Sequence, residues 1–129
     1  MIDWTVRYRE NNSFWIEAHD DYSRYLFTSH ALDRIFDRIF DRTTNMKDVG
    51  DLEKPVRRIV KCLSHQRVDK WIMQYDFGTK LIIHDNDIRM VYIIVCNCNR
   101  YDIISTYNEF WKRYDNTHGT PELWVSLSR

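Results

Sequence analysis

Residues 71–107 read WIMQYDFGTKLIIHDNDIRMVYIIVCNCNRYDIISTY, and this stretch decides the fold that we expect. Its β-branched and aromatic residues gather in short runs, and turn-forming residues such as Asp85-Asn86-Asp87 separate them. The runs have the length of strands, and the breaks have the length of hairpin loops. The stretch therefore predicts a four-stranded antiparallel meander, with strands over residues 71–75, 80–84, 90–97 and 101–107.

Upstream of this stretch, three patterns complete an α+β fold. Residues 4–9 and 13–17 alternate like strands around an Asn-rich break, which predicts an N-terminal hairpin. Apolar residues then recur at helical spacing over residues 31–42, just after the N-cap oxygens that Thr28 and Ser29 offer. A second helical pattern runs through Val56, Ile59, Val60 and Leu63.

The size and composition of the chain favour one domain. It has 129 residues, of which 43% are hydrophobic, enough for one core but not for a second domain. We therefore expect a single domain over residues 1–129, with the tail from residue 108 capping the sheet. No apolar run approaches the roughly 18 residues of a membrane span, and the first residues lack a signal-peptide pattern. Three cysteines are an odd number for a disulfide framework, which favours the cytoplasm.

Charge is balanced overall but unevenly distributed. The formal net charge is zero, with 19 basic and 19 acidic residues, which disfavours electrostatic binding of a polyanion by the chain as a whole. Residues 54–80, however, hold seven basic and only two acidic side chains. Four of these cations follow helical spacing and would contact a phosphate backbone: Lys54, Arg57, Arg58 and Lys61. An ordinary solvated helix face explains the same spacing equally well.

The helix expected over residues 31–42 carries a basic edge that suggests a phosphodiester site. Its edge residues recur every four positions and lie along one side of the helix: His30, Arg34, Arg38 and Arg42. Guanidinium groups bind phosphate oxygens in two-pronged fashion, and an imidazole exchanges protons near neutral pH. Aspartates three residues after two of these arginines leave a second interpretation open, a solvated ladder of ion pairs.

This His-x-x-x-Arg-x-x-x-Arg helix, followed by a second helix and a meander with a polar and aromatic end, resembles the barnase/EndoU/colicin/RelE superfamily of small RNases. The resemblance covers residues 28 to about 107 and implies a RelE-like fold and a metal-independent endoribonuclease, as in toxin and phage relatives. It implies that His30 is the general acid or base, Arg34 a phosphate clamp and Lys80 a cation over the scissile phosphate. It also implies that a strand end touches the substrate through Ser105, Thr106 and Tyr107. The neutral net charge departs from many basic relatives.

Such cleavage needs few catalytic groups, because RNA supplies the nucleophile, its 2′-hydroxyl group. The protein has only to remove that proton, stabilise charge on phosphorus and protonate the leaving 5′-oxygen. The product is a 2′,3′-cyclic phosphate, and no cofactor is needed. His84, at the end of the strand that begins at Lys80, is a second candidate for the proton exchange.

Soft metal ligands are also present, enough in number for tetrahedral zinc: Cys62, His65, Cys96 and Cys98. Their spacing is that of no known zinc finger, and Cys62 lies at a helical position compatible with burial, so we predict no metal. The 19 aromatic residues divide between core packing and base stacking. Tyr107 is the ring best placed to stack on a base.

Functions from different classes follow from these features. The first is an endoribonuclease that acts on messenger RNA and is held in check by a protein inhibitor. The alternative is a small protein that binds a partner, such as a host protein, without catalysis; an even charge balance and many aromatic residues suit it. A structural subunit, or a nucleic-acid-binding module without chemistry, is a third hypothesis. Salt-dependent RNA binding that survives His30→Ala would distinguish it.

Overall fold

The structure is a computed structural model, and it describes residues 3–8, 14–19, 23–28, 30–31, 53–98, 100–109 and 114–127. The elements are, in chain order, β1 (Asp3–Tyr8), β2 (Phe14–His19), β3 (Arg24–Phe27), α2 (Glu53–Ser64), α3 (Gln66–Ile72), β4 (Lys80–Asp85), β5 (Met90–Asn97), β6 (Arg100–Asn108) and β7 (Glu122–Val125).

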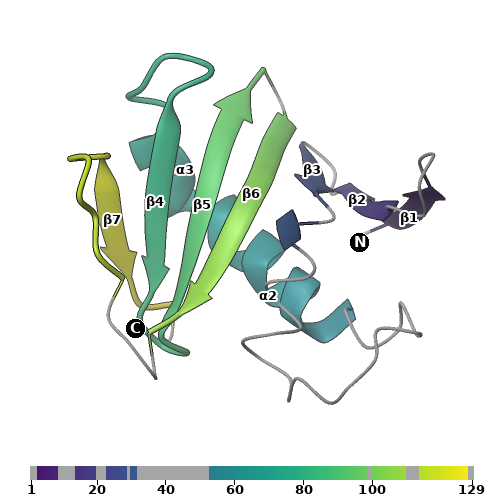
Figure 1. The fold of residues 1–129 in the computed structure, drawn as a ribbon. Helices are drawn as coiled ribbons and strands as arrows, with labels where there is room; N and C mark the ends of the chain where they lie inside the picture. The colour runs from purple at the N-terminus through teal and green to yellow at the C-terminus, as the bar shows by residue number, and fades with distance from the viewer. Residues whose placement is uncertain are drawn as a thin grey trace.

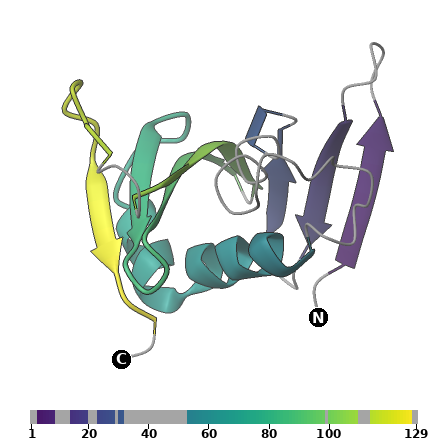
Figure 2. The same cartoon turned by 60° about the horizontal axis from the view of Figure 1, so that its bottom comes forward.

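The described strands form one sheet of seven strands in the order β1-β2-β3-β6-β5-β4-β7 (Figure 1). Neighbours pair antiparallel except at β3–β6 and β4–β7, which are parallel. Helices α2 and α3 both lie against one face of this sheet (Figure 2). We call the core between the helices and the sheet the helix-side core, and the opposite face of the sheet the far face. The expected α+β class is confirmed.

The apolar spacing of α2 is the one that the sequence predicts. Its four repeating apolar side chains are all buried in the helix-side core: Val56, Ile59, Val60 and Leu63. The helix ends at Ser64, and α3 begins after His65. The Nδ1 atom of His65 accepts a hydrogen bond of 3.3 Å from the backbone N–H of Arg67 and so caps the new helix. In α3, Val68 and Ile72 face the core.

The central strands β4, β5 and β6 bury side chains on both faces. Leu81 and Ile83 of β4 lie in the helix-side core, whereas Ile82 between them packs on the far face. Strands covered on both faces appear in sequence as continuous apolar runs. A register shift between β5 and β6 pairs Ile93 with Ser105 and leaves Ile104 as the extra residue of a bulge.

The expected strand over residues 71–75 is wrong. Trp71 and Ile72 end α3, and the following residues turn back toward β4, with the backbone N–H groups of Gln74 and Tyr75 donating to the carbonyl oxygens of Trp71 and Ile72. The physical reason is tertiary: Val68 and Ile72, one helical turn apart, bury the same face of a capped helix. This packing overrides the strand preference of the aromatic residues.

The sheet is also larger and less regular than the expected four-stranded meander. The N-terminal hairpin and the antiparallel β4-β5-β6 unit are present as expected. Two strands that the sequence did not predict, β3 and β7, join through parallel pairings and make the sheet mixed. Residues 122–125 therefore extend the sheet at its edge, where we expected the tail to cap it.

The helix expected over residues 31–42 begins as expected. His30 and Ala31 are helical, and Thr28 Oγ1 accepts a 3.1 Å hydrogen bond from the backbone N–H of Ala31. Ala31 is buried in the helix-side core. Residues 32–42 lie outside the described residues. No helix in the described part of the chain has both the length and the apolar character needed to cross a membrane.

Candidate functional site

Exposed cations concentrate on the two described helices. Five of them lie on α2 and α3, and we call the surface that they form the basic helix face: Lys54, Arg57, Lys61, Arg67 and Lys70. Residues 54–80 contain two acidic residues, Asp69 and Asp76. Asp69 is half-buried and accepts a 2.5 Å hydrogen bond from Tyr101 Oη, and Asp76 lies beyond the end of α3. Of the cations predicted to contact RNA, Lys54, Arg57 and Lys61 thus belong to this face.

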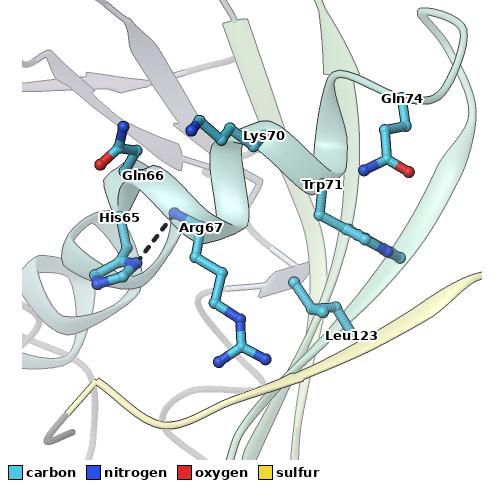
Figure 3. Close-up of a pocket in the computed structure, with 7 residues that line it drawn as sticks. All are labelled: His65, Gln66, Arg67, Lys70, Trp71, Gln74 and Leu123. Atoms are coloured by element: carbon cyan, nitrogen blue, oxygen red, sulfur yellow. Dashed lines mark hydrogen bonds between the residues drawn. The ribbon is translucent and has the colours of Figure 1, made fainter.

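A groove of about 480 Å³ lies at the α3 end of the basic helix face, and we call it the α3 groove. In Figure 3, the side chains of Arg67 and Trp71 extend from α3 toward Leu123 of β7, with Gln74 beside the indole ring. Trp71 is half-buried and meets Tyr75 edge to face, with ring centroids 5.0 Å apart. The groove therefore combines a guanidinium group with an aromatic wall.

His65 lines the α3 groove where α2 gives way to α3 (Figure 3). Because its Nδ1 atom accepts the N–H of Arg67, the neutral ring carries its proton on Nε2. The side chain is exposed, so Nε2 can reach a bound group. An imidazole with a fixed tautomer, beside Arg67, can donate a hydrogen bond or a proton to a phosphodiester oxygen.

Arg58 differs from the other cations predicted to bind RNA on α2. Its Nε and Nη2 atoms donate to the two carboxylate oxygens of Asp85 at 2.8 and 2.7 Å, and Nη2 also donates to Asp87 at 3.1 Å. Asp85 is fully buried and accepts a further 2.8 Å hydrogen bond from Tyr92 Oη. The hydrogen bond to Asp85 is the main reason that the pKa of Arg58 is raised. Arg58 thus anchors α2 to β4.

The residues expected to form the nuclease centre come from opposite sides of the sheet. His30 is exposed and precedes Ala31, which lies in the helix-side core. Lys80 alternates with Leu81 along β4 and so lies on the far face, and Ser105 lies there too, opposite Ile93. Within the described residues, no hydrogen bond or ion pair joins His30, Lys80 and Ser105. Arg34 and Arg38 lie outside the described residues, so their roles stay predictions.

The strand end that was expected to touch RNA is divided between the two faces. Thr106 is fully buried on the helix side, and Ser105 is buried on the far face. The Ser105 hydroxyl group has no hydrogen-bond partner among the described residues. Tyr107 is half-buried and packs against Tyr114, with ring centroids 4.7 Å apart. These side chains do not form one exposed polar surface.

His84 occupies a second pocket, on the far face beside the edge strand β7. The residue is 3% exposed, and both ring nitrogens contact carboxylate oxygens: Nδ1 lies 2.9 Å from Glu109 Oε1 and Nε2 lies 3.1 Å from Glu122 Oε1. The ring also stacks on Trp124, with centroids 4.5 Å apart and an angle of 14° between the planes. Sequence reasoning named His84 but missed its three partners, because they lie far along the chain and belong to no motif.

This second pocket is acidic. Besides Glu122, it is lined by Asp115 and by Tyr114. The pKa of Tyr114 is raised, first by burial and then by the negative charge of its surroundings, Glu122 and Asp115 included. Such surroundings disfavour a phosphate group, so His84 is poorly placed for the proton exchange with RNA that the sequence suggested.

The cysteines do not gather with His65. In the parts of the chain that the structure describes, no three or more His, Cys, Asp or Glu side chains are grouped so as to hold a metal ion. Burial raises the pKa of the Cys62 thiol to about 12 and that of Cys96 to about 11. Cys98 is exposed.

Comparisons with known proteins identify no relative of this chain. No family model matches the chain, and neither a curated protein nor a solved structure matches it. The resemblance to small RNases is therefore an interpretation of the sequence alone. The basic helix face with its groove and the acidic pocket on the far face are the two features of the structure that indicate a function.

Proposed function

We propose that this chain binds single-stranded RNA through the basic helix face and the α3 groove. The observation that carries the proposal is the gathering of five exposed cations on two consecutive helices, with an aromatic wall at one end. Lysine and arginine supply most of the affinity of proteins for a phosphate backbone, because binding releases condensed counterions. Aromatic rings add stacking that tolerates any base sequence.

The dimensions of the basic helix face suit a stretch of several nucleotides. Helix α2 has 12 residues and α3 has seven, which corresponds to about 18 Å and about 10 Å of helix at 1.5 Å per residue. Lys54, Arg57 and Lys61 follow one another at three-and-four spacing, so they lie along one side of α2. A flexible backbone laid along this side meets one cation after another and then reaches the α3 groove.

The neutral composition of the chain does not oppose this proposal, because charge is separated in space. Several acidic side chains are engaged away from the basic helix face: Glu17 with Arg24, Asp85 and Asp87 with Arg58, and Glu109 and Glu122 with His84. The field near the helices is set by the local cations, since exposed charges more than a Debye length away, about 8 Å at physiological salt, are largely screened.

The α3 groove adds base stacking to the electrostatic attraction of the basic helix face. The Trp71 indole ring and the Arg67 guanidinium group line the groove on either side of Leu123 (Figure 3), and a base that enters can stack on one of these planes. Base stacking on an aromatic side chain contributes about 1–3 kcal/mol per base. This contact favours unpaired bases, because the bases of a duplex already stack on one another.

Metal-independent cleavage of the bound RNA is the second candidate function, and the position of His65 favours it. His65 lines the α3 groove beside Arg67, whereas His30 lies at the start of another helix and is not among the residues that line this groove. His65 would take the acid or base role that the sequence gave to His30. Arg67 would stabilise the additional negative charge on phosphorus.

Binding is tested by fluorescence anisotropy with a short labelled single-stranded RNA. The double variant R67Q/K70Q should raise the Kd by about tenfold or more, as loss of two phosphate contacts implies. Lys80→Gln is the matched control, because Lys80 is exposed on the far face of the sheet. Equal weakening per charge removed, one in Lys80→Gln and two in R67Q/K70Q, would show that only net charge matters, and an unchanged Kd in R67Q/K70Q would contradict the proposed surface.

Cleavage is tested by incubating the protein with mixed RNA in EDTA and analysing the ends for 2′,3′-cyclic phosphate. His65→Ala should abolish cleavage and His30→Ala should not; the reverse result would restore the assignment made from the sequence. Binding without cleavage in every protein would identify a nucleic-acid-binding module. Absence of both would favour the partner-binding alternative.

A further inference from the structure

The far face of the sheet holds a pocket of about 380 Å³, distinct from the proposed RNA surface, and we call it the His84 pocket. The alternation of β7 separates the two sites. Leu123 lines the α3 groove, whereas its neighbours Glu122 and Trp124 line the His84 pocket. The pocket lies beside His84 of β4, which pairs with Trp124 across the parallel strands.

The walls of the His84 pocket are held in place by hydrogen bonds of their own. Asn116 closes the loop before β7, because its side-chain amide donates to Thr120 O at 2.7 Å and accepts from Thr120 N at 3.1 Å. Glu109 holds the start of the segment, since its Oε2 atom accepts the backbone N–H of Tyr114 at 3.0 Å. A ligand would therefore enter a site whose shape already exists, which lowers the entropy lost on binding.

The His84 pocket carries net negative charge. Ionised carboxylates only accept hydrogen bonds, so two carboxylate contacts require either an imidazolium ring or one protonated carboxyl group. In either case His84, Glu109 and Glu122 together carry one negative charge, and the exposed Asp115 adds another. Of the described residues, no lysine or arginine lines this pocket.

The aromatic wall of the pocket favours a cationic ligand, as the negative charge of the pocket does. One face of the Trp124 indole is covered by the His84 ring, and the residue is nevertheless 47% exposed. The electron-rich face of an indole ring attracts cations within about 6 Å. Glu122 uses Oε1 for His84, and its Oε2 atom accepts no hydrogen bond from the described residues.

We infer that the His84 pocket binds a compact organic cation, a guanidinium or primary ammonium group, between Glu122, Asp115 and the ring of Trp124. A guanidinium group fits best, because its planar fork can engage a carboxylate while it stacks on an aromatic ring. The cation is either a free small molecule or an arginine or lysine side chain of a protein. The inference does not depend on RNA binding, since it concerns the other face of the sheet.

The test is an NMR titration of the whole chain with methylguanidinium chloride, followed through the indole N–H signal of Trp124 assigned with a Trp124→Phe sample. Saturable shifts confined to the pocket residues are expected. Glu122→Gln should raise the Kd by about tenfold or more, as expected for loss of a charge-assisted hydrogen bond. Asp115→Asn should weaken binding by a smaller factor, and because Asp115 is exposed this variant keeps the fold intact if Glu122→Gln does not. Asp76→Asn is the control of equal charge, exposed and outside the pocket, and should leave the Kd unchanged.

The source of the cation is distinguished by comparing free arginine with the blocked peptide Ac-Gly-Arg-Gly-NH2. Binding of the peptide would identify a protein side chain as ligand, and binding of free arginine alone would identify a small molecule; both support the inference. Absence of saturable shifts, equal binding by wild type, Glu122→Gln and Asp115→Asn, or acetate binding in place of methylguanidinium would overturn it. RNA titrations of the same samples distinguish this result from that for the basic helix face.

Discussion

Arg58 of α2 and Asp85 of β4 form a two-pronged ion pair, with N–O distances of 2.8 and 2.7 Å, in which the aspartate is fully buried. A buried carboxylate that loses its cationic partner is left uncompensated in a low-dielectric environment, and Arg58 is the one cation paired with Asp85 among the described residues. Arg58→Ala should therefore lower the free energy of unfolding by about 3–5 kcal/mol, as measured by urea denaturation.

The control for this prediction is one residue away. Arg57→Ala removes the same charge from the same helix at an exposed position and should lower stability far less, by at most about 1 kcal/mol. Equal losses of stability in the two variants would show that helix propensity or net charge, and not the pair with Asp85, determines the result.

The contrast between Arg57 and Arg58 shows where sequence reasoning about the candidate site stops. Both arginines belong to one basic run with helical spacing, and the sequence assigned both to RNA. The helix leaves Arg57 exposed and places Arg58 over the buried Asp85. An acidic partner that is 27 positions away becomes visible only when the helix is packed on the sheet.

The fold likewise has elements that the sequence predicted and elements that it did not. The apolar positions of α2 and the β4-β5-β6 hairpins are local patterns, and the sequence predicted both. The parallel strand β7 pairs with β4 across a long separation in sequence, which no local pattern reports. His84 meets Glu109, Glu122 and Trp124 for the same reason, so the far-face pocket could not be predicted.

Salt dependence gives a quantitative check of the RNA proposal. Single-stranded nucleic acid contributes a slope of about −0.7 per neutralised phosphate in a plot of log K against log salt concentration. If the five cations of the basic helix face each contact one phosphate, the slope is roughly −3.5, and it should fall in magnitude by roughly 1.4 in R67Q/K70Q. Anisotropy titrations across a range of salt concentrations measure it, and a slope near zero would show that RNA binds without phosphate contacts.

Cysteine labelling checks the assignment of the buried thiols. The pKa of Cys62 is raised to about 12 and that of Cys96 to about 11, first through burial, so at pH 8 both remain protonated and unreactive. Cys98 is exposed. Iodoacetamide at pH 8 should therefore label one cysteine in the native protein and all three in urea, as mass spectrometry can count. Rapid labelling of Cys62 in the native protein would show that α2 detaches from the sheet.

Ser105 offers a test that separates a catalytic serine from a buried one. Its hydroxyl group is buried on the far face with no hydrogen-bond partner among the described residues, and a buried hydroxyl without a partner destabilises the folded state. Ser105→Ala should therefore leave the free energy of unfolding unchanged or raise it by up to about 1 kcal/mol, with RNA binding unaffected. Ser64→Ala, at an exposed helix end, is the control and should be nearly neutral. Loss of RNA cleavage in Ser105→Ala with stability retained would instead support the role that the resemblance gave to this serine.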